Sequence, residues 1–219
     1  MAAKKRVVVF DFDGVIADSF GLHLACWQEV LGGLGASVSD EALRKALGWS
    51  SLDTARLLLK ETGAAAKPAE VTERKRALFR ERAKEELQPM PGAADAVTRL
   101  GEGFFVAVTS WRSRETVESA LGRFGITDRL DAVLTGDDLR PKDEFDDLLS
   151  AAVDRVGLKR GSGVMVEDSR NGLLAAKRAG MKSVAFDSNP KFKVDYSMAD
   201  AVIGSLDELQ PELLHAVFG

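Results

Sequence analysis

Two acidic side chains stand at the end of the first apolar run in the sequence. Asp11 and Asp13 follow residues 7–10, Val-Val-Val-Phe, which predict a strand buried on both faces, as in a parallel sheet. Ligands of open α/β sheets bind at the carboxyl ends of such strands. Two carboxylates this close repel each other unless a cation or a shared proton relieves them. A plain turn also uses Asp and Gly, but it does not need two acids, so we favour a functional site.

A second acidic pair, Glu167 and Asp168, follows the apolar stretch at residues 163–166. If both strands lie in one parallel sheet, their carboxyl ends meet at the same edge. Four carboxylates at that edge would form a set of hard oxygen ligands, which favours Mg²⁺ over zinc. The sequence therefore predicts a magnesium site made by Asp11, Asp13, Glu167 and Asp168.

Two hydroxyl residues, Thr109 and Ser110, follow a third predicted strand at residues 104–108. A hydroxyl group and backbone N–H groups at a strand end can hold a phosphate oxygen. This signal is weak alone, because Ser and Thr begin many turns. Trp111 and Arg112 come next, and we expect them to line the same site.

The sequence after residue 88 predicts the sheet that would position these residues. Strands are expected at 104–108, 131–134, 163–166, 183–186 and 201–203, and helices at 91–100, 114–124, 145–156 and 171–179. Such alternation is typical of a parallel sheet with helices on both faces. We predict an α/β fold with a Rossmann-like parallel sheet that also contains the strand at residues 7–10.

Residues 20–87 carry a different pattern. Apolar residues recur at helical spacing, a charged helix is expected at 69–86, and no strand candidate occurs. We therefore predict an all-helical domain at residues 20–87, inserted after the first strand of a core formed by residues 1–19 and 88–219. Because its linkers would leave from the active end of that strand, the insertion could close over the site.

The composition excludes several other classes of protein. The chain has 219 residues, of which 45% are hydrophobic and 29% charged, and a net charge of −4, so no basic field favours nucleic acid. The single cysteine, Cys26, allows neither an intrachain disulfide nor a cysteine zinc cluster. No apolar run could span a bilayer, and the basic N-terminus leads straight into a strand rather than a cleavage site. We expect a cytoplasmic protein.

Three stretches resemble motifs of the haloacid dehalogenase superfamily. Residues 11–19, DFDGVIADS, resemble motif I, which reads DxDG followed by (T/V/A)DS. Residues 163–181, GVMVEDSRNGLLAAKRAGM, resemble motif IV over their whole length, and Thr109 stands where motif II has a Ser or Thr. The resemblance covers most of the chain and is greatest to the helical-cap subfamily of phosphoglycolate phosphatases and β-phosphoglucomutases.

The resemblance implies roles for the acidic residues. Asp11 would be the nucleophile that forms an aspartyl-phosphate, and Asp13 the acid and base that exchanges protons with the leaving group and with water. Mg²⁺ would be held by Asp11, the backbone carbonyl of Asp13 and Asp168, with Glu167 beside it. Dehalogenases of the superfamily lack the second aspartate, so Asp13 favours phosphate chemistry.

The resemblance also implies residues that bind the phosphate oxygens. Thr109 would use its side chain and Ser110 its backbone amide, with Gly14 in the same site. Motif III of the family offers a lysine, usually as KPxPD, whereas this chain reads Arg-Pro-Lys-Asp at residues 140–143. Lys142 is our candidate for that role and Arg140 is the alternative. A solvated surface lysine is the competing interpretation.

Within the insertion, His23 and Trp49 are our candidates for contacts with the substrate. His23 stands where β-phosphoglucomutases carry a histidine, but residues 48–52, Gly-Trp-Ser-Ser-Leu, lack the arginine with which those mutases bind a second phosphate. His23 and Cys26 do not suffice for a metal site, and packing is the expected role of Cys26. Residues 74–76 are expected to form a solvated helix face.

We therefore expect a Mg²⁺-dependent phosphatase that hydrolyses a small phosphorylated metabolite through an aspartyl-phosphate. The alternatives are a sugar-phosphate mutase of the β-phosphoglucomutase type and a catalytically silent ligand-binding protein on the same scaffold. The four acids argue against the silent protein. We expect a monomer or weak homodimer that binds neither nucleic acid nor membranes.

Overall fold

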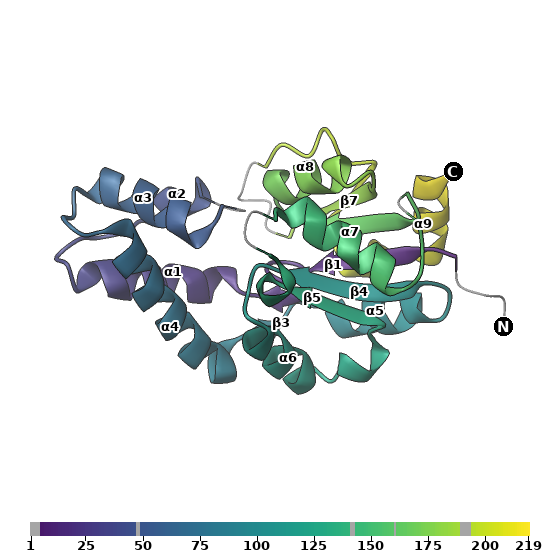
Figure 1. Cartoon of the computed structure of the whole chain (residues 1–219), viewed down its shortest axis with the longest axis horizontal. Coiled ribbons are helices and arrows are strands. Elements are labelled where there is room, and N and C mark those ends of the chain that lie inside the picture. Colours follow the sequence, from purple (N-terminus) through teal and green to yellow (C-terminus); the bar gives the residue numbers. More distant parts are fainter. Residues whose placement is uncertain (1–4, 47–48, 141–142, 160, 189–193) are drawn as a thin grey trace. The chain divides into compact units, whose positions relative to one another are not determined.

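The computed structural model describes residues 5–46, 49–140, 143–159, 161–188 and 194–219. The chain divides into two compact units. One, here called the core unit, contains the residues up to Asp18 and those from Gln88 to Gly219. The other, called the helical unit, is Ser19–Leu87. Each unit is described by itself (Figure 1).

A parallel six-stranded sheet forms the centre of the core unit and confirms the predicted fold class. Its strands follow the order β5-β4-β1-β6-β7-β8, so the first strand of the chain lies between β4 and β6. Residues 7–10 of β1 are fully buried, as their uninterrupted apolar run predicted. The strands are β1 (Val7–Asp11), β4 (Phe105–Ser110), β5 (Ala132–Thr135), β6 (Gly163–Glu167), β7 (Lys182–Phe186) and β8 (Ala201–Ile203).

Helices cover both faces of this sheet (Figure 1). Val7 and Val9 pack into one apolar cluster with α7 and α8, and since side chains alternate along a strand, Val8 and Phe10 point to the opposite face. Figure 1 shows α5 and α6 on that opposite side. The helices of the core unit are α5 (Ala93–Gly101), α6 (Arg114–Arg123), α7 (Phe145–Arg155), α8 (Arg170–Arg178) and α9 (Pro211–Phe218).

The helical unit consists, among its described residues, of helices and turns without a strand. Ser39 and Ser50 cap α2 and α3, because their side chains accept bonds from the N–H groups of Ala42 and Asp53. An apolar cluster that includes Trp27 joins the helices. They are α1 (Phe20–Gly32), α2 (Asp40–Arg44), α3 (Ser51–Thr62) and α4 (Pro68–Glu86).

The structure adds an element that the sequence did not predict. Strands β2 (Ala17–Asp18) and β3 (Gln88–Pro89) form an antiparallel pair where only linkers were expected. Two-residue strands show no periodicity that could reveal them. Helix α5 also begins at Ala93 rather than at residue 91, because Gly92 takes a left-handed conformation with φ of 79°.

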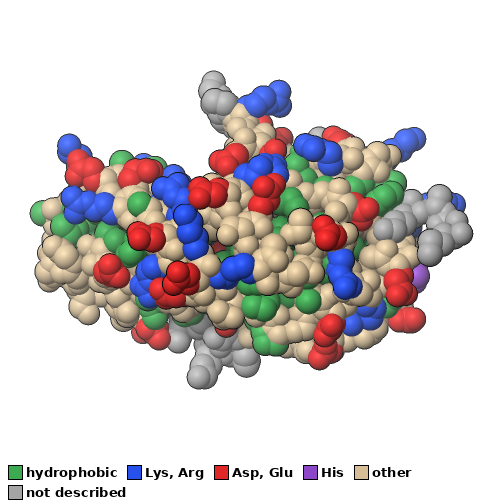
Figure 2. All heavy atoms as spheres, turned by 90° about the horizontal axis from the view of Figure 1, so that it is seen from below, with side chains coloured by type: hydrophobic (Ala, Val, Ile, Leu, Met, Phe, Trp, Pro, Cys, Tyr) green, Lys and Arg blue, Asp and Glu red, His purple; other side chains and the backbone are tan. Residues whose placement is uncertain are grey.

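Charged side chains of both signs are interspersed over the face shown in Figure 2. Among the described residues, the helices are all too short or too polar to cross a bilayer.

Candidate active site

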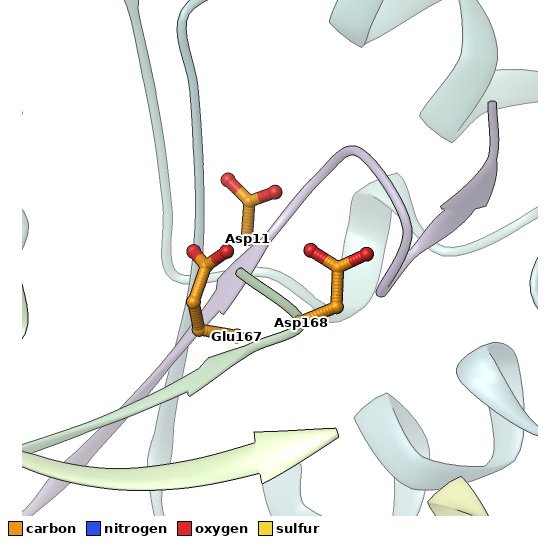
Figure 3. A group of neighbouring side chains, drawn as sticks. All are labelled: Asp11, Glu167 and Asp168. Carbon is orange, nitrogen blue, oxygen red and sulfur yellow. The ribbon is translucent and has the colours of Figure 1, made fainter. Parts of the chain in front are cut away.

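Three carboxylates from two neighbouring strands meet at the carboxyl end of the sheet. Asp11 is the last residue of β1, Glu167 the last of β6, and Asp168 follows it. One carboxylate oxygen of each lies within 4.8 Å of those of the other two. Figure 3 shows the three carboxylate groups on the same side of the two strand ends. Three hard oxygen donors at this spacing fit a cation such as Mg²⁺.

Burial and mutual charge repulsion raise the pKa values of these carboxylates. Burial, followed by the charges of Glu167, Asp13 and Asp168, raises the pKa of Asp11 well above its usual range. Burial and the Glu167 charge do the same for the pKa of Asp168. Burial raises the pKa of Glu167 to about 7, although hydrogen bonds from Ser169 oppose the shift. A bound cation would relieve this repulsion by favouring the ionised forms.

These shifts predict a pH-dependent stability of the metal-free protein. In the folded state, the side chain of Glu167 stays protonated up to a pH of about 7, whereas its usual pKa is 4.5. The contribution of Glu167 to the stability of the fold is therefore full below pH 4.5 and is lost as the pH rises through about 7. In EDTA, we expect Glu167→Gln to be more stable than wild type at pH 8, by up to roughly 3 kcal/mol, and to lose that advantage at pH 4.5. Thermal unfolding at both pH values measures the difference. An advantage that does not change with pH would contradict the assignment.

Two glycines make room for the carboxylates. Gly14 has φ of 82°, and a Cβ atom there would lie 2.0 Å from Oδ2 of Asp168. Gly172 lies in α8, and a Cβ atom there would lie 2.1 Å from the carboxylate of Glu167. Both positions therefore require glycine for the observed geometry.

We expect Gly172→Ala to weaken Mg²⁺ binding by about tenfold, because the new methyl group displaces the carboxylate of Glu167 while the helix accepts alanine. Isothermal titration with Mg²⁺ measures the affinity. Gly122→Ala in α6 is the matched control, since nothing lies within 4 Å of its Cβ position. Equal affinities of the two variants would show that Glu167 tolerates the shift.

Thr109 offers a buried hydroxyl beside the nucleophile candidate. It is the register partner of Asp11 in the β1–β4 pairing and is 0% exposed. Its Oγ1 has no hydrogen-bond partner in the part of the chain that the structure describes. An unpaired buried hydroxyl is costly, and a phosphate oxygen would satisfy it. Thr109 and Ser110 form the end of β4 itself, rather than following it as predicted.

The turn after Asp11 holds Asp13 next to β4. The Phe12 N–H donates to the carbonyl of Thr109 at 3.0 Å, and the Gly14 N–H donates to the carbonyl of Ala17 at 2.8 Å. Nε of Arg112 donates to Oδ2 of Asp13 at 2.8 Å. Arg112 therefore contacts one of the predicted site residues, while its place in a working site stays a prediction.

A tyrosine that the sequence analysis missed supports the second acidic pair. The Tyr196 hydroxyl donates to the backbone carbonyl of Asp168 at 3.1 Å. Burial and the nearby carboxylates raise the pKa of its phenol well above the usual range, so it stays a donor. It lies far from Asp168 in the sequence and no motif signals it.

The motif III candidates are only partly described. Lys142 lies outside the described residues, so its role stays a prediction. Arg140, the alternative, has a side chain that is 86% exposed and forms an ion pair with Asp143 at 3.3 Å. That partner and the high exposure do not favour Arg140 as the phosphate ligand.

His23 and Trp49 belong to the helical unit, and their contacts with a substrate stay predictions. Within that unit, Nδ1 of His23 lies 2.5 Å from Nζ of Lys75, and its ring stacks on Phe79 at 4.3 Å. Trp49 is 45% exposed. Cys26 is buried, which confirms its predicted packing role.

The expectation of a solvated face at residues 74–76 is wrong for Lys75, which is only 1% exposed. Its ammonium group lies over the rings of Phe79 and Trp27. Lys75 stands four residues after Val71 and four before Phe79, so all three share one face of α4. The signal was present in that spacing, but surrounding charges obscured it.

Comparison with known proteins identifies the family. Residues 8–186 match the model of the haloacid dehalogenase-like hydrolases, and the chain belongs to this family. The predicted class of enzyme, a phosphoric monoester hydrolase of the haloacid dehalogenase type, is confirmed by this match and its relatives.

Two relatives and two structures illustrate the similarity. "Fructose-1-phosphate phosphatase YqaB" of Escherichia coli is 26% identical over 177 residues, covering 81% of this chain and 94% of that protein. "Phosphoglycolate phosphatase" of Shigella boydii is 29% identical over 234 residues, covering 95% and 92%. The structure of CbbY from Rhodobacter sphaeroides with phosphate matches with a TM-score of 0.79 at 25% identity, covering 94% and 96%. A β-phosphoglucomutase from Clostridium difficile, at 16% identity, TM-score 0.79 and coverage of 98% and 97%, shares the fold.

Proposed function

We propose that this protein is a Mg²⁺-dependent phosphatase that hydrolyses a small phosphorylated metabolite through an aspartyl-phosphate on Asp11. The observation that carries the proposal is the meeting of three carboxylates at the ends of β1 and β6, within 4.8 Å of one another. The buried hydroxyl of Thr109 is in register with Asp11 and has no hydrogen-bond partner among the described residues, which supports an anionic ligand at the same place.

The ligands of Mg²⁺ would be the carboxylates of Asp11 and Asp168 and the backbone carbonyl of Asp13, with Glu167 beside them. When bound, Mg²⁺ would neutralise negative charge on the phosphoryl group and on the nucleophile. These ligands are all hard oxygen donors, which Mg²⁺ prefers. The carboxylates repel one another, and this repulsion favours the binding of a cation.

In the first step, Asp11 attacks phosphorus in line, the bond from phosphorus to the leaving oxygen breaks, and Asp13 gives its proton to that oxygen. Thr109 donates from its hydroxyl to a phosphoryl oxygen, and the backbone amide of Ser110 holds another. Gly14 and Lys142 are proposed to complete this binding of the phosphate.

In the second step, Asp13 takes a proton from a water molecule, which attacks phosphorus and releases Asp11. Phosphate leaves, and both carboxyl groups return to their starting states. Positioning and charge neutralisation supply most of the catalysis in such phosphoryl transfer.

The direct test is release of inorganic phosphate from p-nitrophenyl phosphate. Activity should require Mg²⁺, disappear in EDTA and return with excess Mg²⁺. Full activity in EDTA would contradict the metal site, and no turnover at any Mg²⁺ concentration would favour the silent binding protein.

The names of two relatives support a proposal for the substrate class. Phosphatases named for fructose 1-phosphate and phosphoglycolate both resemble the chain over most of its length. We propose a small phosphorylated sugar or hydroxy acid, to be identified by phosphate release from a panel of such compounds. We also propose a cytoplasmic monomer or weak homodimer, which cell fractionation and light scattering would test.

A sugar-phosphate mutase is the second candidate, favoured by His23 and the shared fold of a β-phosphoglucomutase. The absence of an arginine at residues 48–52 argues against it. Incubation with β-glucose 1-phosphate decides: a mutase forms glucose 6-phosphate, whereas a phosphatase forms glucose and free phosphate.

We propose that the helical unit acts as a cap. Its two connections to the core run through β2 and β3, and Asp13 forms a β-bridge with Ala17 of β2. A cap that excludes water during the first step and admits it during the second would suit this chemistry. Beryllium fluoride with Mg²⁺ should slow hydrogen exchange at residues 17–18 and 88. Unchanged exchange with the mimic bound would contradict a moving cap.

A further inference from the structure

Arg112 and Asp13 form an ion pair that is largely shielded from water. Nε of Arg112 lies 2.8 Å from Oδ2 of Asp13, and the two side chains are only 18% and 25% exposed. A charge-assisted hydrogen bond of this length is stronger than a neutral one, and partial burial protects it from the screening that weakens surface pairs. The pair is therefore able to select one orientation of the Asp13 side chain.

The backbone around Arg112 is fixed on both sides. Its N–H donates to Oγ of Ser110 at 3.1 Å, and its carbonyl accepts from the N–H of Gly136 at 3.1 Å. Gly136 passes so close to the Trp111 carbonyl that a Cβ atom would lie 2.8 Å from that oxygen. The Trp111 ring stacks on Phe145 at 5.3 Å. The guanidinium group is thus presented from a well-anchored segment.

The segment is tied further to the turn after β5. The Arg114 N–H donates to Oδ2 of Asp137 at 2.8 Å, and Nη2 of Arg114 lies 2.6 Å from Oδ2 of Asp138. Asp138 in turn accepts from the Thr135 N–H at 2.8 Å. The segment that carries Arg112 therefore continues directly from the end of β4, which carries Thr109 and Ser110, and is bonded to the turn after β5.

On the other side of the pair, the backbone of Asp13 is held in a tight turn, and contacts such as the bond from Arg112 set the direction of its carboxyl group. The carboxyl group can give its proton to a leaving oxygen in line with Asp11 only when it points toward that oxygen. We propose that Arg112 is a positioning residue: by donating to Oδ2 it fixes the direction in which Oδ1, the oxygen that carries the proton, faces the leaving group. This inference rests on the proposed function of Asp13 as the proton donor.

The dependence of the rate on the leaving group distinguishes a positioning role of Arg112 from a purely structural role. When the bond from phosphorus to the leaving oxygen breaks, a strongly basic oxygen must take the proton of Asp13, whereas a nitrophenolate leaves without much help. Phenyl phosphate and p-nitrophenyl phosphate differ in this property and little in shape. A loss of positioning should therefore affect phenyl phosphate far more.

The experiment compares kcat/KM for the two substrates in the full-length protein with saturating Mg²⁺. Arg112→Met keeps the length of the side chain without its donors. We expect kcat/KM to fall by about tenfold or more for phenyl phosphate and by no more than about twofold for p-nitrophenyl phosphate. Arg112→Lys, which restores a cation and donors, should recover part of the loss and serves as the second variant should Arg112→Met fold poorly.

Arg178→Met is the matched control. Arg178 also pairs with an aspartate, Asp146 at 3.0 Å, but at the end of α8 and with a side chain that is 52% exposed. The ratio of the two kcat/KM values should equal that of wild type. A change as large as that of Arg112→Met would overturn the inference, because any lost ion pair would then produce it.

A double-mutant cycle tests whether Arg112 acts through Asp13. In an Asp13→Asn background, Arg112→Met should cause no further loss with p-nitrophenyl phosphate or phenyl phosphate. A loss that persists there, or an equal loss for both substrates in the single variant, would overturn the inference by showing direct substrate binding or structural damage. If Asp13→Asn itself shows no preference for the nitrophenolate leaving group, the proposed role of Asp13 fails and the inference with it. If Asp13→Asn shows that preference but Arg112→Met does not, the inference alone fails.

Discussion

Asp11→Asn should reduce phosphatase turnover by at least about a thousandfold while leaving the protein folded, because the change removes the nucleophile at almost constant shape. Asp11 follows the fully buried residues 7–10 of β1, and burial and three neighbouring carboxylates raise its pKa. Its charged form is therefore unfavourable in the absence of a cation. For that reason the variant should melt at or above the wild-type temperature in EDTA.

Both readouts are needed to interpret this variant. Phosphate release gives the turnover, and a thermal melt in EDTA shows whether the fold survives. Asp128→Asn, at an exposed position outside the site, is the control and should match wild type in both. Turnover within about tenfold of wild type in folded Asp11→Asn would exclude Asp11 as the nucleophile.

Asp168→Ala should raise the Mg²⁺ concentration for half-maximal activity by at least about tenfold. The variant removes one of the carboxylates that approach within 4.8 Å, and it also removes the side chain against which Gly14 packs. A hard-cation site depends on its number of anionic ligands, so the loss should appear first in metal affinity. Activity at saturating Mg²⁺ should fall less.

A Mg²⁺ titration of initial rates measures the change. Asp154→Ala, on the exposed face of α7, is the control for a lost carboxylate elsewhere. A titration curve of Asp168→Ala that overlays that of wild type would exclude Asp168 as a ligand. The Tyr196 hydroxyl bonds to the backbone of residue 168 rather than to its side chain, so it can keep this segment in place in the variant.

The sheet and the acidic cluster were predictable from sequence because their signals are local. An uninterrupted run of four apolar residues is typical of a strand that is buried on both faces, and this pattern predicted the burial of β1 within the sheet. The convergence of parallel strands predicted that the four acids meet, and the carboxylates of Asp11, Glu167 and Asp168 do so. The side chain of Asp13, the predicted fourth member, is not in this group and accepts a bond from Arg112. The ends of strands were less predictable. Thr109 and Ser110 belong to β4 because they pair with β5, but their polar side chains did not indicate a strand.

Contacts between distant segments were not predictable. Nothing in the sequence pairs Tyr196 with the carbonyl of residue 168, because the contact joins segments that are 28 residues apart. Arg112 was expected near the site, but its partner depends on how the turn at Asp13 folds back on β4. Lys75 was misjudged because a charged residue normally faces water, whereas here three aromatic or heterocyclic rings surround its ammonium group.

The β2–β3 pair has a consequence for the order of folding. Strand β1 must find β4 across the whole length of the helical unit, and closing so long a loop carries an entropic cost that slows folding. When the helical unit has formed and Asp18 has paired with Gln88, the two ends of that loop already lie side by side. The search for β4 then involves only residues 12–16 and residues 90–104, which include α5. A helical unit that folds early would thus hold the two flanking segments together and favour the pairing of β1 with β4.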